Sequence, residues 1–247
     1  MFQTQKKGNT VTYMDAQPQT TPVCIPRDLQ LQAAMFRLGH IEDEIRSGYE
    51  ILRKYHKTVT IFGSARTSPD NPYYLAAKQA AERLAYDGYA IVSGGGHGIM
   101  GAANEGANTA VQKGAKAAGG ESIAFNIKLP HEQQLNEYAT ESFEFQHFAP
   151  RKIVMTMYAD AYLYFPGGFG TLDELAEILT LIQTGKAAPA PIVLFGSKFW
   201  SNLDSFFREN MLAEGAIAEK DTQLYTITDS VDELIELVKS NRTYCGH

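Results

Sequence analysis

Cysteine is scarce in this chain of 247 residues, which contains only Cys24 and Cys245, near its opposite ends. Two distant cysteines have neither the spacing of a metal site nor the number that a disulfide-stabilised fold needs. The sequence therefore excludes a disulfide scaffold. Because a chain without disulfides suits a reducing compartment, we expect a cytoplasmic protein.

Clusters of basic residues and long apolar runs are also missing. The formal net charge is −6, and no run of lysine and arginine provides the surface that phosphate backbones require, so we expect no nucleic-acid partner. No stretch approaches the roughly 18 apolar residues of a membrane span. The two lysines of residues 1–20 are not followed by an apolar core, so we expect no signal peptide, no membrane anchor and a flexible tail over residues 1–26.

The chain does contain a regular alternation of apolar strands and amphipathic helices. We expect strands at residues 58–62, 89–92, 122–127, 140–145, 161–165, 191–195 and 224–227. We expect the intervening and final helices at residues 74–86, 102–113, 149–158, 171–183, 198–211 and 230–239. This alternation predicts an α/β fold of βαβ units: a single doubly wound domain over residues 57–247, with a mostly parallel sheet and helices on both faces.

A helical extension is expected before this domain, over residues 27–56. Its apolar residues recur at mostly helical spacing that is broken near Gly39 and Gly48, which indicates one or two helices. An amphipathic segment of this kind packs on its own domain or serves a subunit interface, and the sequence leaves both open.

The stretch 161–183 joins a buried strand, a glycine turn and an amphipathic helix. Pro166 ends the strand, and Gly167, Gly168 and Gly170 allow the backbone to turn tightly. Thr171 is predicted as the N-cap of the helix. Glu174 stands three residues later, which is the spacing of a capping box. One interpretation is therefore that Glu174 only closes this box at the start of a well-capped helix. A helix N-terminus aimed out of the carboxyl edge of a sheet is suited to bind an anion such as phosphate.

Two further glycine turns follow strands, at Gly63-Ser64 and at residues 94–101, and we expect all three turns to meet in one crevice. The second contains the pattern G-x-G-x-x-G, but the acid that should follow the next strand in a dinucleotide site is missing, since Glu121 precedes that strand. Neither turn carries the lysine of a Walker loop, which argues against ATP hydrolysis of that type. Close packing of helix on strand accounts for some of these glycines.

Two cations, Arg151 and Lys152, follow Pro150 at a predicted helix start. The N-terminal end of a helix is already positive, so two cations there are unfavourable unless an anion lies nearby. The alternative is that both side chains project into solvent.

Taken together, the segments SGGGHGIMGAANEGA (93–107), PRK (150–152) and PGGFGTLDE (166–174) resemble the LOG family, the cytokinin riboside 5′-monophosphate phosphoribohydrolases, once labelled lysine decarboxylases. The resemblance spans residues 57–230. It implies a Rossmann-like domain, a homodimer or a higher oligomer of dimers, and hydrolysis of the N-glycosidic bond of a nucleoside 5′-monophosphate, with no cofactor and no metal.

The resemblance also assigns site residues by position. Arg151 and Glu174 match the catalytic pair of the family. The expected substrate- and phosphate-binding residues are Gly63, Ser64, Gly94, Gly95, Gly96, Lys152, Gly167, Gly168, Gly170, Thr171 and Asp173. Two departures concern base selectivity. Phe148 and Ala149 stand where plant-type members have Met-His, with His147 beside them, and His97 stands where many longer bacterial members have proline. The preferred base therefore stays open.

The predicted chemistry follows from the bond to be broken. Cleavage of a ribosyl C–N bond passes through an oxocarbenium-like state, which needs a carboxylate near the anomeric carbon and help for the departing base. Glu174 can stabilise the cationic sugar or orient water, and Arg151 can hold the phosphate, the ribose or the base. One alternative is a non-catalytic carrier of a nucleotide or of molybdenum cofactor. A lysine decarboxylase would need pyridoxal phosphate on a lysine, and none stands at the glycine turns.

Overall fold

The computed structural model describes residues 25–129 and 134–240, which divide into two compact units between Leu38 and Gly39. In the first unit the described residues form helix α1 (Arg27–Phe36), none of whose residues is buried, and the chain turns at Arg37. Helix α2 (Leu38–Leu52) then begins. The tail predicted for residues 1–26 lies almost wholly outside the described residues.

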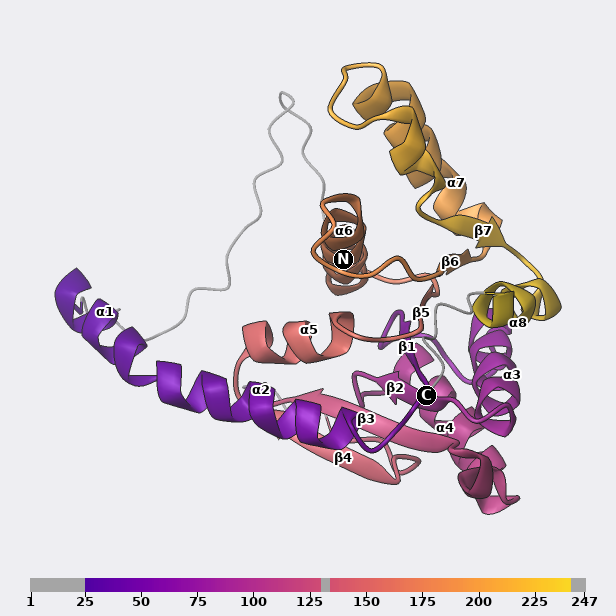
Figure 1. Cartoon of the computed structure of the whole chain (residues 1–247), viewed down its shortest axis with the longest axis horizontal. Helices are drawn as coiled ribbons and strands as arrows, with labels where there is room; N and C mark the ends of the chain where they lie inside the picture. The colour runs from indigo at the N-terminus through magenta and orange to yellow at the C-terminus, as the bar shows by residue number, and fades with distance from the viewer. Residues whose placement is uncertain (1–24, 130–133, 241–247) are drawn as a thin grey trace, which may run out of the picture. The chain divides into compact units, whose positions relative to one another are not determined.

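The second unit contains a seven-stranded parallel sheet with strand order β4-β3-β2-β1-β5-β6-β7 (Figure 1). Its strands are β1 (Thr58–Phe62), β2 (Ala90–Ser93), β3 (Glu121–Ile127), β4 (Glu141–Phe145), β5 (Ala161–Tyr164), β6 (Ile192–Phe195) and β7 (Thr226–Thr228). The helices are α3 (Pro72–Tyr86), α4 (Ile99–Gln112), α5 (Phe148–Thr156), α6 (Phe169–Gln183), α7 (Ser197–Phe206) and α8 (Val231–Ser240). Short 3-10 turns lie at Ala115–Ala118 and Glu219–Gln223, and a π-helical segment at Phe207–Leu212.

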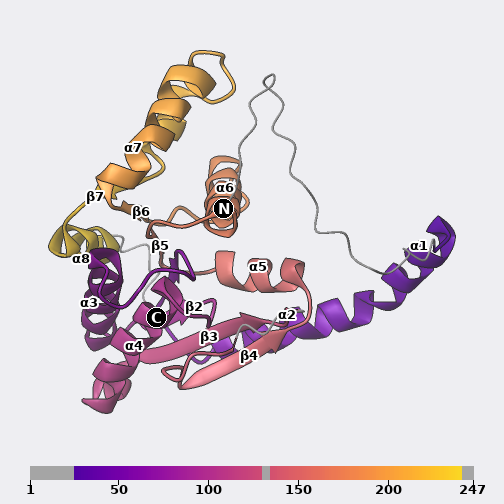
Figure 2. The same ribbon diagram turned by 180° about the vertical axis from the view of Figure 1, so that it is seen from behind.

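Helices cover both faces of this sheet, as predicted. Helices α3, α4 and α8 bury one face, on which the β1 side chains Val59 and Ile61 lie. Helices α2, α5, α6 and α7 pack on the other face, on which Phe62 lies (Figures 1 and 2). Because successive side chains of a strand alternate between faces, a strand buried on both reads as a continuous apolar run. The Rossmann-like α/β fold is therefore confirmed.

The strand order places a topological switch point beside β1. The chain runs outward through β2, β3 and β4, then returns to lay β5 against the other side of β1. Connections leaving β1 and β5 at their carboxyl ends therefore diverge to opposite faces, which opens a crevice for a ligand. The loops of the predicted site leave the sheet at this point.

The break predicted at Gly48 is wrong, because α2 runs through that residue without interruption. Gly48 instead allows close packing of α2 on α5 and β4. A Cβ atom there would lie 2.7 Å from both methyl groups of Val154 and 3.2 Å from the ring of Phe145. The interruption predicted near Gly39 is found two residues earlier, at Arg37.

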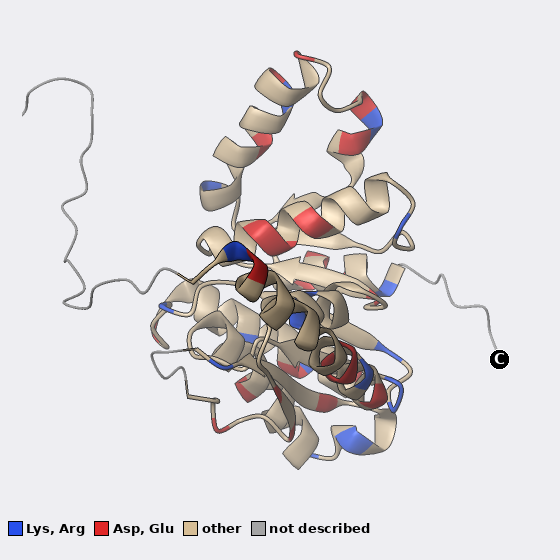
Figure 3. Ribbon diagram, turned by 90° about the vertical axis from the view of Figure 1, so that its left-hand side faces the viewer, with Lys and Arg blue, Asp and Glu red and all other residues tan. Residues whose placement is uncertain are grey.

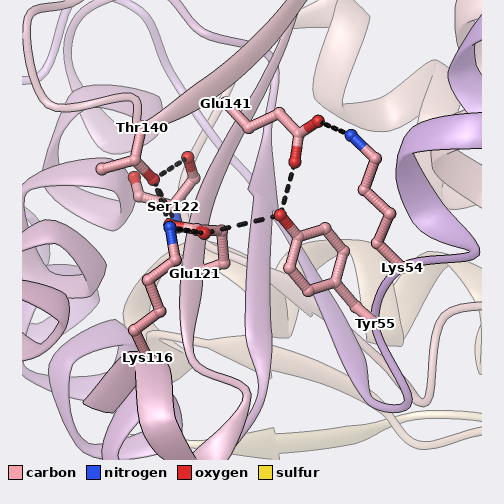
Figure 4. A network of polar contacts seen from close by, with 7 residues as sticks. All are labelled: Lys54, Tyr55, Lys116, Glu121, Ser122, Thr140 and Glu141. Atoms are coloured by element: carbon pink, nitrogen blue, oxygen red, sulfur yellow. Dashed lines mark hydrogen bonds and ion pairs between the residues drawn. The ribbon is translucent and has the colours of Figure 1, made fainter. Parts of the chain in front are cut away.

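The amino ends of β3 and β4 are tied to the segment after α2 by a polar network (Figure 4). Glu141 accepts a hydrogen bond from the hydroxyl of Tyr55 and pairs with Lys54. Glu121, which is buried, pairs with Lys116 at 3.1 Å. Burial and the two neighbouring carboxylates raise the pKa of Tyr55, so its hydroxyl remains a donor. The network fixes the start of the sheet relative to α2.

None of the helices formed by the described residues has both the length and the apolar character that crossing a bilayer demands. Lysine and arginine are interspersed with aspartate and glutamate over the part of the chain that Figure 3 colours. No group of three or more histidine, cysteine, aspartate and glutamate side chains within residues 25–129 and 134–240 is arranged to hold a metal ion.

Candidate functional site

The three glycine turns meet at the carboxyl ends of β1, β2 and β5. The N–H of Ser64 donates to the carbonyl of Pro166 at 3.0 Å, which joins the turns after β1 and β5. The N–H of Ile99, the first residue of α4, donates to the carbonyl of Ser64 at 3.0 Å. The turn after β1 is thus held between the other two, as expected for a single crevice.

Packing within the protein accounts for several glycines of these turns. A Cβ atom on Gly63 would lie 2.6 Å from Ile99, and one on Gly98, where φ is +63°, would lie 2.2 Å from the carbonyl oxygen of Ser64. In contrast, nothing lies within 4 Å of a Cβ atom built on Gly168 or Gly170. These two glycines therefore border open space at the start of α6.

Helix α6 begins earlier than the capping-box pattern predicts. Its N-cap is Gly168, in an extended conformation, and no side chain caps its first turn. Thr171 is the third helical residue and is buried, with its hydroxyl oxygen 2.1 Å from a Cβ atom built on Gly167. The prediction of Thr171 as N-cap is wrong, and Glu174 closes no capping box with it. The first N–H groups of α6 therefore face the crevice without a side-chain partner.

Glu174 instead faces Arg151 across the interface between α6 and α5. One Glu174 carboxylate oxygen lies 3.7 Å from Nη1 of Arg151, and the two side chains are 15% and 9% exposed. Arg151 is fixed by the sheet: its Nε donates to the carbonyl of Phe125 at 2.7 Å and its Nη2 to that of Gly94 at 3.5 Å. A Cβ atom on Gly94 would clash with this guanidinium, at 2.2 Å. Glycine is therefore required there to admit the arginine.

The electrostatics of this pair are set by burial. Burial raises the pKa of Glu174 to about 7, against the opposing effect of Arg151 and with a contribution from Asp173. Burial also lowers the pKa of Arg151, while Glu174 raises it. A carboxyl group with a pKa near neutral pH can exchange a proton in either direction, as a general acid or base requires.

Lys152 is directed to the acidic face of α6. Its amino group lies 2.9 Å from Asp173 and 3.1 Å from Glu177. Burial disfavours its charge, but hydrogen bonds to these two carboxylates outweigh that effect, so its pKa is raised. Carboxylates of α6 thus compensate both cations at the start of α5, which is the nearby negative charge that the sequence pattern called for.

A buried amide network supports the glycine turn after β2. The side-chain amide of Asn136 donates to the carbonyls of Gly95 and Gly96, each at 3.0 Å, and lies 2.8 Å from the side-chain oxygen of Asn104. Asn104 also accepts from the hydroxyl of Ser93 at 2.6 Å. Sequence reasoning missed these residues. The available signal was a set of polar residues flanking apolar segments, since buried polar groups require partners.

A cleft of about 460 Å³ lies next to these turns. It is bordered by His97 and Gly98 of the glycine turn, by Arg66 after β1, and by the segment 134–138. Its volume is in the range of small-molecule sites. The cleft thus borders the glycine turn after β2, whereas neither Arg151 nor Glu174 lines it.

Comparison with known proteins identifies relatives of this chain. The sequence model of a family described as "Possible lysine decarboxylase" matches residues 108–238. A probable cytokinin riboside 5′-monophosphate phosphoribohydrolase of Oryza sativa subsp. japonica is 27% identical over 180 residues, which cover 72% of this chain and 75% of that protein. A cytokinin riboside 5′-monophosphate phosphoribohydrolase of Mycobacterium marinum is 28% identical over 182 residues, which cover 72% of this chain and 91% of that protein.

Solved structures share the fold. The molybdenum cofactor carrier protein of Chlamydomonas reinhardtii aligns over 76% of this chain and 99% of its own, with 20% identity and a TM-score of 0.54. The protein TM1055 aligns over 74% of this chain and 99% of its own, with 18% identity and a TM-score of 0.53. At this level of identity the similarity concerns the fold alone.

Proposed function

Because this chain belongs to the LOG family of cytokinin riboside 5′-monophosphate phosphoribohydrolases, we propose that it hydrolyses the N-glycosidic bond of a nucleoside 5′-monophosphate. The substrates are AMP or N6-modified AMP, and the products are the free base and ribose 5-phosphate. The observation that carries the proposal is the pairing of Arg151 with Glu174 where the three glycine turns meet. A reactive carboxylate beside an anion-binding helix end is the arrangement that this reaction needs.

The phosphate is expected to bind at the start of α6. The first turn of this helix has no side-chain cap, and the space above Gly168 and Gly170 is open. Gly167 and Thr171 shape the same turn, and the turns at Gly63-Ser64 and 94–96 complete the proposed site. Binding energy from a phosphate remote from the reacting bond positions the ribose for reaction.

Glu174 is proposed as the catalytic carboxylate. In its ionised form it takes a proton from the attacking water as the C1′–N bond breaks and the bond electrons leave with the base. The departing base takes up a proton, so the overall reaction consumes one water molecule. Arg151, fixed by two backbone carbonyls, provides a positive charge that lowers the pKa of Glu174 against the effect of burial and is available to a substrate oxygen. The ion pair between Lys152 and Asp173 holds α5 against α6 and so keeps Arg151 close to Glu174.

The test compares wild type with Glu174→Gln for release of free base from AMP and from N6-isopentenyl-AMP, followed by chromatography. The variant is expected to be slower by about 10² to 10³, the usual cost of losing one positioned catalytic group. Glu236→Gln, an exposed carboxylate on α8 at the opposite face of the sheet, is the matched control and should retain wild-type rates. Equal rates in wild type and Glu174→Gln would refute the assignment.

Two other functions are separated by the same experiment. A non-catalytic carrier of a nucleotide or of molybdenum cofactor would retain ligand through purification and show no turnover. A lysine decarboxylase would need a lysine free to form a Schiff base with pyridoxal phosphate. Lys152, which adjoins Arg151 at the proposed site, is engaged by two carboxylates and so is not free to form that bond.

We further propose a cytoplasmic homodimer, or a higher oligomer of dimers. Phe148 and Phe169, at the starts of α5 and α6, are 57% and 92% exposed beside the proposed site. Large exposed aromatic side chains next to a site favour burial against a second copy. Light scattering coupled to gel filtration should give twice the chain mass or an even multiple of it, and a Phe169→Asp variant should shift the mass toward that of the monomer.

A further inference from the structure

Two adjoining hollows lie at the opposite edge of the sheet from the proposed active site, before the amino ends of β1, β5 and β6. The larger, of about 420 Å³, is bordered by Met157 and by the small residues of segment 187–190. The second, of about 330 Å³, extends beneath Tyr49. His56, Tyr158 and Asp160 border both hollows. Each volume is in the range of small-molecule sites.

Tyr158 stands between these hollows in a strained conformation. Its φ is +69°, and no other non-glycine residue among those described has a positive φ. This backbone conformation is unfavourable for an amino acid with a side chain, whereas glycine adopts it without strain. The residue is nevertheless 74% exposed, and its ring meets that of Tyr49 edge to face at 5.6 Å. Strain of this kind gathers at functional sites, and here it displays an aromatic ring at the shared mouth of two hollows.

The walls of the larger hollow are held in place by hydrogen bonds. The hydroxyl of Tyr162 donates to the carbonyl of Thr156 at 2.6 Å, which fixes the chain just before Met157. A carboxylate oxygen of Asp160 accepts the N–H of Thr58 at 2.7 Å. On the other side, the carbonyl of Leu181 accepts the N–H groups of both residues 186 and 187, at 2.8 and 3.0 Å. The hollow is therefore formed before any ligand arrives, which lowers the cost of binding.

The chemistry of the lining combines aromatic surface with positive charge. Tyr158 offers a ring face, and Lys186 borders the hollow from the segment before β6. The nearby acid, Asp160, is engaged by a backbone N–H. Small side chains at 187–190 leave room for a flat group. We propose that this hollow is a second ligand site that binds a planar aromatic ring bearing an anionic group, with the ring on Tyr158 and the anion at Lys186.

Such a ligand is available to cells as a nucleotide or as an aromatic carboxylate, and one probe of each kind distinguishes these sources. Two methionines report binding at the two edges of the sheet. Met157 borders the hollow, whereas Met100 lies against Gly94 at the other edge. Methyl-¹³C methionine spectra of the full chain would be recorded during titration with AMP and, separately, with indole-3-carboxylate. The variants Met157→Leu and Met100→Leu assign the two signals.

We expect the Met157 signal to shift saturably with at least one of the two probes. Lys186→Ala and Tyr158→Ala should each weaken that binding about tenfold, the usual worth of one partly desolvated ionic or aromatic contact. Lys198→Ala, an exposed lysine on α7, should bind as wild type does. Tyr158→Gly retains the backbone shape without strain, so it separates loss of the ring from loss of the fold, and it too should bind about tenfold more weakly.

Three results would overturn the proposal. The first is an unchanged Met157 signal at millimolar concentrations of both probes. The second is a shift confined to Met100, which would assign the ligand to the carboxyl edge alone. The third is a Met157 shift that persists with unchanged affinity in Lys186→Ala and in Tyr158→Gly, because neither the charge nor the ring would then contribute.

Discussion

Replacing Arg151 by glutamine removes the positive charge that lies 3.7 Å from a carboxylate oxygen of Glu174. At an effective dielectric constant of about 20, opposite unit charges about 4 Å apart attract by about 4 kcal/mol. Since one pKa unit corresponds to about 1.4 kcal/mol, this loss is expected to raise the pKa of Glu174 by about 3 units. The starting pKa is about 7. In the variant, Glu174 is therefore protonated at neutral pH and cannot accept a proton from water.

The assay is a pH titration of ¹³C-labelled glutamate carboxyl signals, with Glu174→Gln used to assign the resonance. Arg151→Lys retains a positive charge and is the matched control, in which the pKa should rise less than in Arg151→Gln. Base release from AMP at pH 7 should fall by about 10² to 10³ in Arg151→Gln. An identical Glu174 pKa in folded wild type and folded Arg151→Gln would refute the electrostatic coupling, because the charge would then not be felt at the carboxyl group.

Three further predictions concern stability and binding. The folded-state pKa of Glu174, about 7, exceeds the ordinary 4.5, so the folded protein binds more protons than the unfolded chain between these values and loses stability as pH rises through that window. Glu174→Gln abolishes this pH dependence. As pH rises from about 4 to about 8, the free energy of unfolding of the variant, measured with urea, should therefore increase by about 3 kcal/mol relative to that of wild type. Gly48→Ala places a methyl group 2.7 Å from the methyl groups of Val154, so its free energy of unfolding in the same assay should be lower than that of wild type by about 1 to 3 kcal/mol. Gly39→Ala is the matched control: no atom lies within 4 Å of a Cβ atom built at this position, so the free energy of unfolding should not fall. Asn136→Ala removes the donor to the carbonyls of Gly95 and Gly96, so KM for AMP should rise by about tenfold or more, and an unchanged KM would show that this turn does not contact substrate.

Much of the sheet could be predicted from the sequence because its strands are buried on both faces. The run 58–62 is apolar or β-branched throughout, and it forms β1 with the predicted bounds. The bounds hold within one residue for the strand at 122–127, which is buried throughout. The strand at 140–145 also has its predicted bounds within one residue, although most of its residues are not buried. Such runs carry their own signal, since no polar face interrupts them.

The errors share a physical cause, which is that tertiary contacts override local patterns. Gly48 reads as a helix break, but the close approach of α2 to α5 is what requires glycine there. Thr171 and Glu174 have capping-box spacing, but the N-cap of α6 is Gly168, in an extended conformation, three residues before the predicted N-cap. The carboxylate of Glu174 is therefore available to Arg151 instead of the helix terminus.

The site could be predicted only in part. Carboxyl ends of parallel strands meet at one edge, so convergence of the three glycine turns followed from the strand pattern. The contact between Arg151 and Glu174 depends on how α5 packs on α6, for which no local pattern gives a signal. Asn136 supports a turn forty residues away through backbone carbonyls, and such partners have no sequence signature.

The most direct test of the proposed hydrolysis is to follow AMP with the purified protein by phosphorus NMR while free adenine is quantified by chromatography. We predict one adenine and one ribose 5-phosphate for each AMP consumed, with no inorganic phosphate, because the C1′–N bond is broken and the phosphate ester is not. Folded protein that leaves AMP and N6-isopentenyl-AMP unchanged, or that releases inorganic phosphate from either, would contradict the proposed reaction.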